Sequence, residues 1–290
     1  MKFEESELVI NQDGSIFHLH LFPEDIGNDI ILVGDPGRVE TVASFFDDIE
    51  LKKQNREFCT ITGTYNNKRI TVISTGIGTD NIDIVVNELD AIANINLKTR
   101  TENKEHKALN FIRIGTSGSL QENVSIDSFL MSVRSIGFDG LLNFYANRNS
   151  ISDLEFEEAL KKHVNWNNLL PSPYVVDASE ELVNKLASKN MTKGITISAP
   201  GFYGPQGRQL RLPIIDANIN DKIEAFEFKN QKITNYEMES SAIFGLSKLL
   251  GHKAVTICTI IANRRTKEYS KDYKPLIKEL IKTVLDRLSI

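Results

Sequence analysis

Two acidic side chains lie two positions apart in the sequence Asn-Tyr-Glu-Met-Glu-Ser at 235–240, directly before an apolar helical pattern. Because a helix N-terminus favours negative charge, Glu237 and Glu239 could serve the helix alone. A glutamate near a helix start can also accept two hydrogen bonds from a vicinal diol, such as the hydroxyl pair of a ribose. The segment by itself leaves both interpretations open.

The sequence Gly-Asp-Pro-Gly-Arg at 34–38 lies between an apolar run and a helical pattern. A turn of this kind exposes backbone N–H groups at a helix start, where an anion is favoured. Arg38 adds a planar fork of donors that matches phosphate oxygens. The turn lacks the signatures of a nucleotide phosphate loop and of a dinucleotide site. It indicates either a phosphate site or an ordinary turn with a surface arginine.

Arg113 lies inside the apolar run 111–114, ahead of a Gly-Thr-Ser-Gly sequence at 115–118. A buried charge needs a partner, and either a bound anion or an internal carboxylate would serve. Ligands collect at the carboxyl ends of strands in α/β sheets, which is where this arginine is expected. The sequence Ser-Thr-Gly-Ile-Gly-Thr at 74–79 has a similar pattern, which is common among turns of this class.

An irregular loop is expected at 201–208, where three glycines and a proline surround two aromatic residues. Phe202 could stack on a planar ring. A uracil edge has two carbonyl acceptors and one N–H donor, so Gln206 and Arg208 would complement it. A rigid surface loop explains the segment equally well. Arg264 follows the apolar run 254–261 and could stabilise negative charge that develops on a base.

Strands and helices that would position these residues alternate along the chain, which predicts an α/β fold with a mixed, largely buried sheet. Asparagines at 66 and 67 predict a hairpin turn, and 94–106 and 143–173 contain two expected surface insertions. Strands are expected at 30–33, 58–62, 69–74, 109–114, 128–133, 194–198 and 254–261. Helices are expected at 39–46, 82–95, 154–163, 180–189, 237–250 and 276–288.

The composition is that of an ordinary soluble protein, with 290 residues, 41% hydrophobic and 25% charged. The net charge of −5 argues against a general nucleic-acid or anionic-membrane surface. Cys59 and Cys258 lie in apolar runs without a metal-binding pattern, so we expect buried, reduced thiols. With no apolar leader and no long apolar run, a cytoplasmic protein without a membrane span is expected.

In their order and approximate spacing, these segments together resemble the uridine phosphorylases of the nucleoside phosphorylase family, which are related to hexameric bacterial purine nucleoside phosphorylases. The resemblance runs from Phe17-His18-Leu19 to the final helix. It also includes Arg56-Glu57-Phe58 and Asn263-Arg264. It implies a single domain over 1–290, a three-layer α/β/α structure and a homodimer with shared active sites or a homohexamer.

The resemblance also implies a reaction and a role for each matching residue. Phosphate would attack C1′ of a nucleoside as the bond to the base breaks, with no metal or organic cofactor. Phosphate would be bound by Gly34, Arg38, Arg113, Thr116 and, from the neighbouring subunit, Arg56. Ribose would be held by Glu237, Met238, Glu239 and, from the neighbour, His18. The base would contact Phe202, Gln206 and Arg208, with Arg264 helping it to leave, and Arg113, Glu239 and Arg264 would be the catalytic residues.

Departures from the family pattern bear on the substrate. Purine enzymes carry a Ser-Asp pair where Asn263-Arg264 stands here, which favours pyrimidines. A purine phosphorylase, a nucleoside hydrolase and a non-catalytic nucleoside-binding protein stay open as alternatives, although three arginines favour phosphate over water as the nucleophile. The preferred nucleoside, the choice between dimer and hexamer, the role of the insertions and a monovalent cation near Glu57 also stay open.

Overall fold

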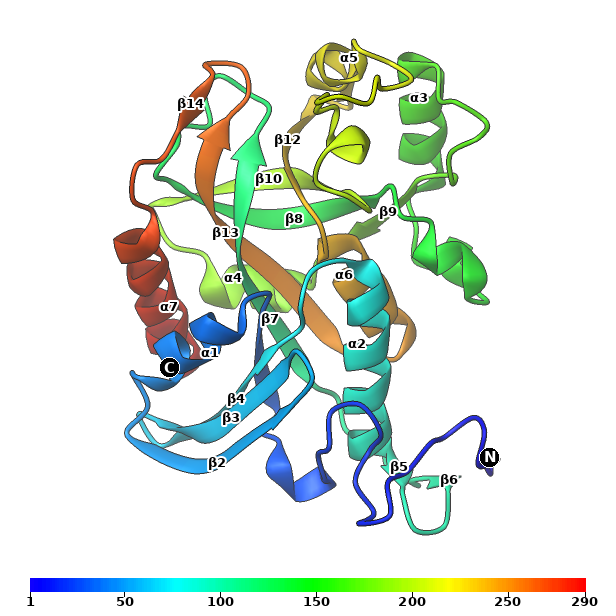
Figure 1. Cartoon of the computed structure of the whole chain (residues 1–290), viewed down its shortest axis with the longest axis vertical. Coiled ribbons are helices and arrows are strands. Elements are labelled where there is room, and N and C mark those ends of the chain that lie inside the picture. Colours follow the sequence, from blue (N-terminus) through cyan, green and yellow to red (C-terminus); the bar gives the residue numbers. More distant parts are fainter.

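A twelve-stranded mixed sheet organises the chain (Figure 1). The computed structural model describes residues 1–290. The strand order is β11-β12-β10-β8-β13-β7-β1-β4-β3-β2, with β14 beside β13 and β9 beside β8. The strands are β1 (Asp29–Val33), β2 (Asp48–Asn55), β3 (Phe58–Tyr65), β4 (Lys68–Ser74), β7 (Asn110–Ser119), β8 (Phe129–Gly137), β9 (Tyr174–Asp177), β10 (Met191–Ser198), β11 (Glu227–Phe228), β12 (Gln231–Glu237), β13 (Lys253–Asn263) and β14 (Glu268–Tyr269).

Part of the sheet closes on itself. Strand β12 pairs with β10 on one side and with β7 on the other, so that β12, β10, β8, β13 and β7 form a ring. Strand β13 runs parallel to β7 and antiparallel to β8, which confirms the predicted mixed sheet. Closure pairs both edges of β12, so its backbone is fixed over the length of these ladders.

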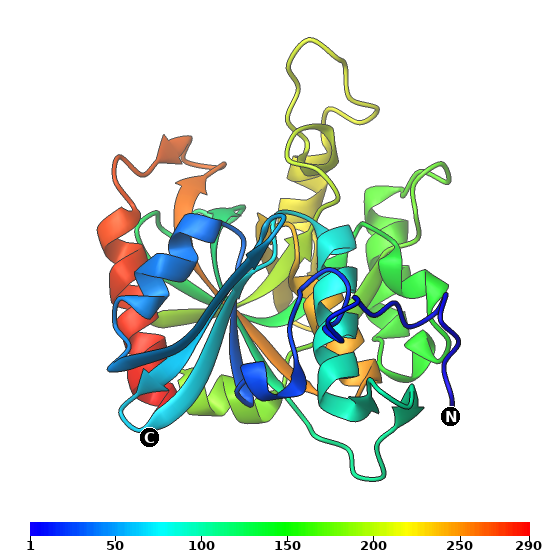
Figure 2. The ribbon, with the colours of Figure 1, turned by 60° about the horizontal axis from the view of Figure 1, so that its bottom comes forward.

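Helices cover both faces of the sheet, which confirms the three-layer α/β fold (Figure 2). Alternate residues of β1 show this directly: Ile30 and Leu32 pack with α2 and α6, whereas Ile31 and Val33 pack with α1, α4 and α7. A third apolar cluster lies under α3 and α5. The helices are α1 (Pro36–Ala43), α2 (Thr79–Asn94), α3 (Leu154–Val164), α4 (Glu180–Leu186), α5 (Ile219–Ala225), α6 (Ser240–Leu249) and α7 (Lys274–Leu288).

The predicted helix at 237–250 is wrong at its N-terminal end, because α6 begins at Ser240. Residues 231–237 form β12 instead, since they hydrogen-bond to strands on both sides. Strands β2, β9, β11 and β14 and helix α5 were also not expected. Strand β2 and helix α5 are mostly polar and lie at the surface, and β9, β11 and β14 have only four, two and two residues. The hairpin turn between β3 and β4 is confirmed, with φ of 48° at Asn66 and 62° at Asn67.

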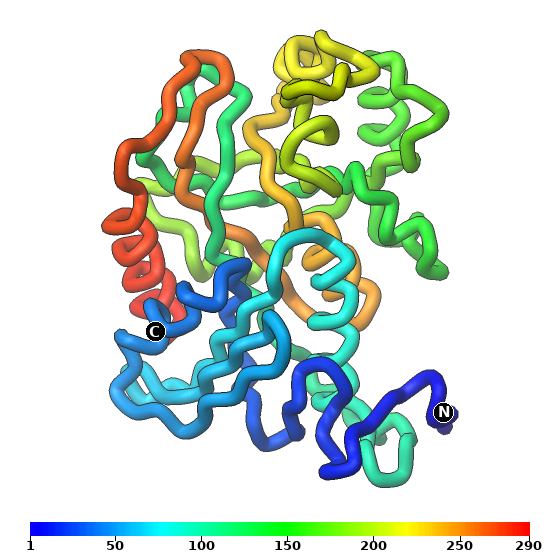
Figure 3. The backbone as a smooth tube through the Cα atoms, in the orientation of Figure 1, coloured from blue at the N-terminus to red at the C-terminus, as the bar shows by residue number.

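The insertion at 94–106 forms a small hairpin of β5 (Ile95–Asn96) and β6 (Thr101–Glu102) at the surface. The N-terminal segment lies beside it (Figure 3), where the Phe3 N–H donates to the Arg100 carbonyl at 2.8 Å. The insertion at 143–173 contains a short 3-10 turn (Arg148–Ser150) and helix α3. None of the helices combines the length and apolar character needed to cross a membrane.

Candidate active site

The carboxyl ends of several strands meet at one place. Strand β1 runs parallel to both β4 and β7, with Val33 beside Ser74 and Leu32 beside Arg113. Both β1 and β4 lead directly into helices, so the turns after them bring two helix N-termini to the same edge. The turns touch, since a Cβ added at Gly34 would lie 3.3 Å from the Gly76 carbonyl oxygen. This is the edge where ligands bind in sheets of this kind.

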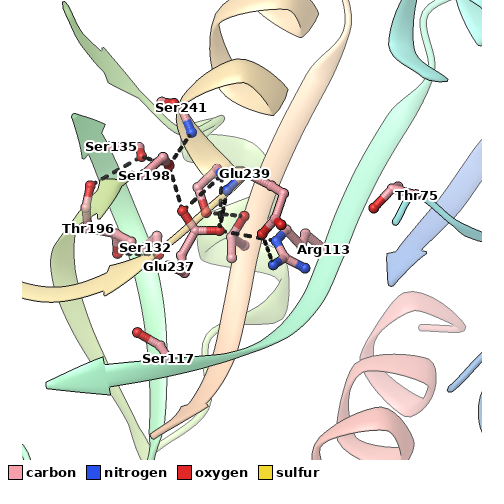
Figure 4. A network of polar contacts seen from close by, with 12 residues as sticks. Thr75, Arg113, Ser117, Ser132, Ser135, Thr196, Ser198, Glu237, Glu239 and Ser241 are labelled. Atoms are coloured by element: carbon pink, nitrogen blue, oxygen red, sulfur yellow. Dashed lines mark hydrogen bonds and ion pairs between the residues drawn. The ribbon is translucent and has the colours of Figure 1, made fainter. Parts of the chain in front are cut away.

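Arg113 is buried at this edge and is paired with two carboxylates (Figure 4). Its Nε donates to Glu237 at 3.2 Å and its Nη2 donates to Glu239. Burial alone would lower the pKa of Arg113, but the two carboxylates outweigh burial and raise it. The sequence left an anion or an internal carboxylate as the partner; the structure supplies carboxylates and leaves Nη1 without a protein acceptor.

Glu239 joins the starts of two helices. It is the residue that precedes α6, and its carboxylate accepts the Gly78 N–H at 2.9 Å, directly before α2. Gly78 has a φ of 102°, a conformation that a residue with a side chain rarely adopts. Burial raises the pKa of Glu239, and Arg113 acts in the opposite direction. A buried carboxylate between two helix N-termini is well placed to accept ligand hydroxyls.

Arg38 completes a positive corner beside Arg113. It is half-buried on α1, and its Nη1 donates to the Ile114 carbonyl at 3.2 Å. Burial lowers the pKa of Arg38, and the charge of Arg113 lowers it further. Thr116 lies half-buried on β7, two residues beyond Ile114. Two neighbouring guanidiniums with no carboxylate on Arg38 form a site that an anion would stabilise.

Two predicted residues lie away from this cluster within the chain. Arg56 is exposed in the turn between β2 and β3, with a φ of 53°. His18 lies in the N-terminal segment, and its Nδ1 is 2.6 Å from the Glu88 carboxylate on α2. Neither contacts Arg113 or Glu239. Both had been expected to act on the neighbouring subunit's site.

The base loop, residues 201–208, brings a second group of cations together. Gln206 is 3% exposed, and its Oε1 accepts Arg208 at 2.5 Å and Arg264 at 2.7 Å. The Arg208 guanidinium also stacks 3.9 Å from the centre of the Phe202 ring. Burial, followed by the charge of Arg208, lowers the pKa of Arg264 to about 10. Neither arginine is bonded to a carboxylate. The loop therefore suits a ligand with several hydrogen-bond acceptors, or one that gains negative charge during a reaction.

Tyr236 connects the two groups of residues. It precedes Glu237 on β12, and the Arg264 guanidinium lies 4.8 Å from the centre of its ring. Met238 lies half-buried between the two glutamates. The sequence did not indicate the role of Tyr236 as a stacking surface or of Gly78 as the partner of Glu239. Neither role could be predicted from neighbouring residues, because each depends on a contact with a residue far away in the sequence.

A separate polar cluster of Asp90, His106 and His252 lies near the 94–106 insertion. The Leu109 N–H donates to Nδ1 of His252 at 3.1 Å, so Nε2 carries the ring proton and donates to Asp90 at 3.0 Å. A metal-binding histidine normally uses one ring nitrogen for the metal and donates from the other. The bonds of His252 therefore fit a hydrogen-bonded clamp for the insertion better than a metal ligand.

Comparisons with known proteins agree with this geometry. The uridine phosphorylase of Thermococcus kodakarensis is 28% identical, over 93% of this chain and 85% of that protein. A DeoD-type purine nucleoside phosphorylase of Listeria monocytogenes is 25% identical, over 84% and 85% of the two chains. A solved Trypanosoma brucei nucleoside phosphorylase with uridine phosphorylase activity superposes with a TM-score of 0.88 at 27% identity, covering 97% and 99% of the two chains.

A purine nucleoside phosphorylase from Toxoplasma gondii, solved in complex with immucillin-H, shares the fold with a TM-score of 0.67 at 20% identity, covering 97% and 98% of the two chains. A family model described as the phosphorylase superfamily matches residues 29–288, which takes in every strand and helix from β1 to α7. With a match over nearly its whole length and the cluster around Arg113 at the expected sheet edge, this chain belongs to the phosphorylase superfamily.

Proposed function

We propose that this protein catalyses the reversible phosphorolysis of uridine to uracil and ribose 1-phosphate, in nucleoside salvage in the cytoplasm. One observation carries the proposal: Arg113 neighbours the cationic Arg38 and also pairs with the buried carboxylate of Glu239. Such a guanidinium can touch an anion on one side while it holds the acceptor for sugar hydroxyls on the other. A bound phosphate would thereby lie next to C1′ of a bound nucleoside.

The reaction needs charge stabilisation at both ends. A phosphate oxygen forms a bond to C1′ while the bond from C1′ to N1 of the base breaks, and its electron pair moves onto the base. Arg38 and Arg113, with Gly34 and Thr116, would bind and orient the phosphate. Glu239 would grip the ribose hydroxyls, beside Met238. Positioning and fixed charges supply most of the rate enhancement in such a step.

The uncompensated cations of the base loop support a pyrimidine as leaving group. Gln206 and Arg208 can bond the carbonyl edge of uracil, and Phe202 can stack on its ring. Arg264 would stabilise the negative charge that the base acquires. The similar proteins named as uridine phosphorylases from Thermococcus kodakarensis and Escherichia coli, both 28% identical, support the same substrate.

A homodimer would complete the site. Arg56 and His18 lie outside the cluster of their own chain, and Arg56 is exposed at a turn from which it can reach a partner. In the proposed dimer, Arg56 adds a third guanidinium to the phosphate of the neighbouring subunit, and His18 reaches the ribose 5′-hydroxyl. A hexamer would be a ring of three such dimers.

The test is a panel of purine and pyrimidine nucleosides, each incubated with and without inorganic phosphate, with base release followed by absorbance. We expect uracil release from uridine only when phosphate is present. Equal release without phosphate would identify a hydrolase, and preferential release of hypoxanthine from inosine would identify a purine enzyme. Absence of release under all conditions, together with nucleoside binding by calorimetry, would identify a binding protein and refute the proposal.

A further inference from the structure

Glu237 has no acceptor capacity left for a ligand. Its Oε1 accepts the Ser198 hydroxyl at 2.5 Å and the Ser240 N–H at 3.0 Å. Its Oε2 accepts the Glu239 N–H at 2.9 Å and Arg113 Nε at 3.2 Å. A carboxylate offers about four lone-pair sites, and protein donors occupy all of them here. With every acceptor position taken, a ligand hydroxyl would have to displace one of these donors to bond Glu237.

Two of the donors around Glu237, from Arg113 and Glu239, belong to residues that would bind phosphate and ribose. Arg113 is held through Nε, which leaves its other two nitrogens to Glu239 and to an anion. Glu237 also accepts the backbone N–H of Glu239, the residue that precedes α6. One carboxylate therefore fixes the plane of the guanidinium and the start of the helix relative to each other. A small movement of Glu237 would move both.

Ser198 and Ser241 lie next to Glu237, and the hydroxyl of Ser198 bonds its carboxylate (Figure 4). The single proton of the Ser198 hydroxyl is donated to Glu237, and the same oxygen accepts the Ser241 N–H at 2.9 Å. The Ser241 hydroxyl donates to Asp139 at 3.0 Å, and the buried Tyr174 hydroxyl donates to Asp139 at 2.9 Å. These buried bonds support the Ser198 hydroxyl at the position from which it donates to Glu237.

We infer that Glu237 is a positioning residue, held in place by Ser198, that aims Arg113 and Glu239 at the reactants. The inference rests on the phosphorolysis proposed above and replaces direct contact between Glu237 and the ribose. The competing explanation is that the buried pair of Glu237 and Arg113 serves folding alone, since breaking such a pair destabilises a protein. The two explanations differ in kinetics, because only a positioning role changes turnover in a folded enzyme.

The mildest test is Ser198→Ala, which removes one donor from Glu237 and keeps its charge. The matched control is Ser132→Ala: this hydroxyl is also fully buried, pairs with Thr196 at 2.5 Å and does not contact Glu237. We expect kcat of Ser198→Ala to fall about 10-fold, the lower end for one lost hydrogen bond to a charged group. The nucleoside KM of Ser198→Ala, and both constants of the control, should stay within about 2-fold.

Substrate comparison separates positioning from direct contact. If Glu237 bonded the 2′-hydroxyl, Ser198→Ala would weaken turnover of uridine and spare 2′-deoxyuridine. A positioning role predicts that turnover of both nucleosides falls, because the aim of Arg113 at phosphate is lost in either case. Sparing of 2′-deoxyuridine would overturn the inference, as would equal kcat in the Ser198→Ala and Ser132→Ala enzymes.

A double-mutant cycle tests whether Glu237 acts through Arg113. Glu237→Gln and Arg113→Lys are measured singly and together in folded enzymes, with circular dichroism as the check on folding. If Glu237 acts through Arg113, the double variant should be within about 3-fold of Arg113→Lys alone. Losses that multiply would overturn the inference. If Glu237→Gln does not fold, the comparison of Ser198→Ala with Ser132→Ala decides.

Failure of the proposed function can be told apart from failure of this inference. A wild-type protein that releases no base with phosphate refutes the function. The rise in Tm on adding inorganic phosphate then still reports on Arg113. A smaller rise in Ser198→Ala than in Ser132→Ala supports positioning of the guanidinium by Glu237, and equal rises in the two variants overturn it.

Discussion

Replacing Glu239 by glutamine should damage ribose recognition without changing the shape of the site. The carboxylate accepts the Gly78 N–H and Arg113 Nη2. A glutamine offers a single acceptor oxygen, so its NH2 group must face either Arg113 Nη2 or the Gly78 N–H, donor against donor in both cases, and it leaves fewer acceptor positions for the ribose hydroxyls. One lost hydrogen bond to a charged group corresponds to about 1.5–3 kcal/mol, or about 10- to 160-fold in kcat/KM for uridine. Because 2′-deoxyuridine lacks one hydroxyl of the pair, its loss should be smaller.

The matched control is Glu157→Gln. Glu157 is another buried glutamate, 2.9 Å from Arg148, but it lies on α3, outside the site. Both variants lose a buried ion pair, so both should lower the Tm. Only Glu239→Gln should lower kcat/KM, measured by uracil release at saturating phosphate on samples confirmed as folded. A Glu239→Gln enzyme with unchanged kcat/KM for uridine would refute the assignment of the ribose site.

Three further predictions follow from the geometry. Arg208→Ala should reduce the ratio of kcat/KM for uridine to that for inosine by about 10-fold, whereas the exposed neighbour Arg211→Ala should leave it unchanged; equal ratios would count against the base loop. Arg56→Ala and Arg113→Ala should each be weak enzymes, but co-expression should restore about a quarter of wild-type activity through mixed dimers, and no recovery would exclude shared sites. Because burial raises the pKa of Cys258 to about 12, its thiol should stay protonated and resist iodoacetamide at pH 8 until the protein unfolds. Labelling is measured by mass spectrometry, and labelled Cys258 in the folded protein would contradict this prediction.

Local patterns were sufficient for much of the fold and for part of the site. The turn after β1 was found because a strand, a glycine turn and a helical pattern are adjacent in sequence. Helix α1 begins earlier than expected, at Pro36, because Asp35 caps it by accepting the Gly37 N–H at 2.9 Å. Strand β1 was found because it is apolar on both faces, as a strand between two helix layers must be. The alternation of such elements predicted the α/β class.

Long-range pairing was beyond the reach of local patterns. Strand β12 is polar for much of its length, and what makes it a strand is its pairing with β10 and β7. Glu239 was placed in a helix for this reason, and its contact with Gly78 spans 161 residues of sequence. The sequence could say that Arg113 needed a partner but not which one, because the two carboxylates are 124 and 126 residues away along the chain.

The closed ring of strands separates two parts of the molecule that could change at different rates during evolution or in the laboratory. Tyr236 and Glu237 lie on β12, whose backbone is tied on both sides, so the sugar and phosphate geometry is part of the framework. The base loop contains one short 3-10 turn, Gly204–Gln206, and is otherwise irregular. Substitutions in that loop can therefore alter which base is accepted while the ring keeps the bond-breaking geometry constant. Altered base preference should be accessible by library selection on residues 201–208 alone.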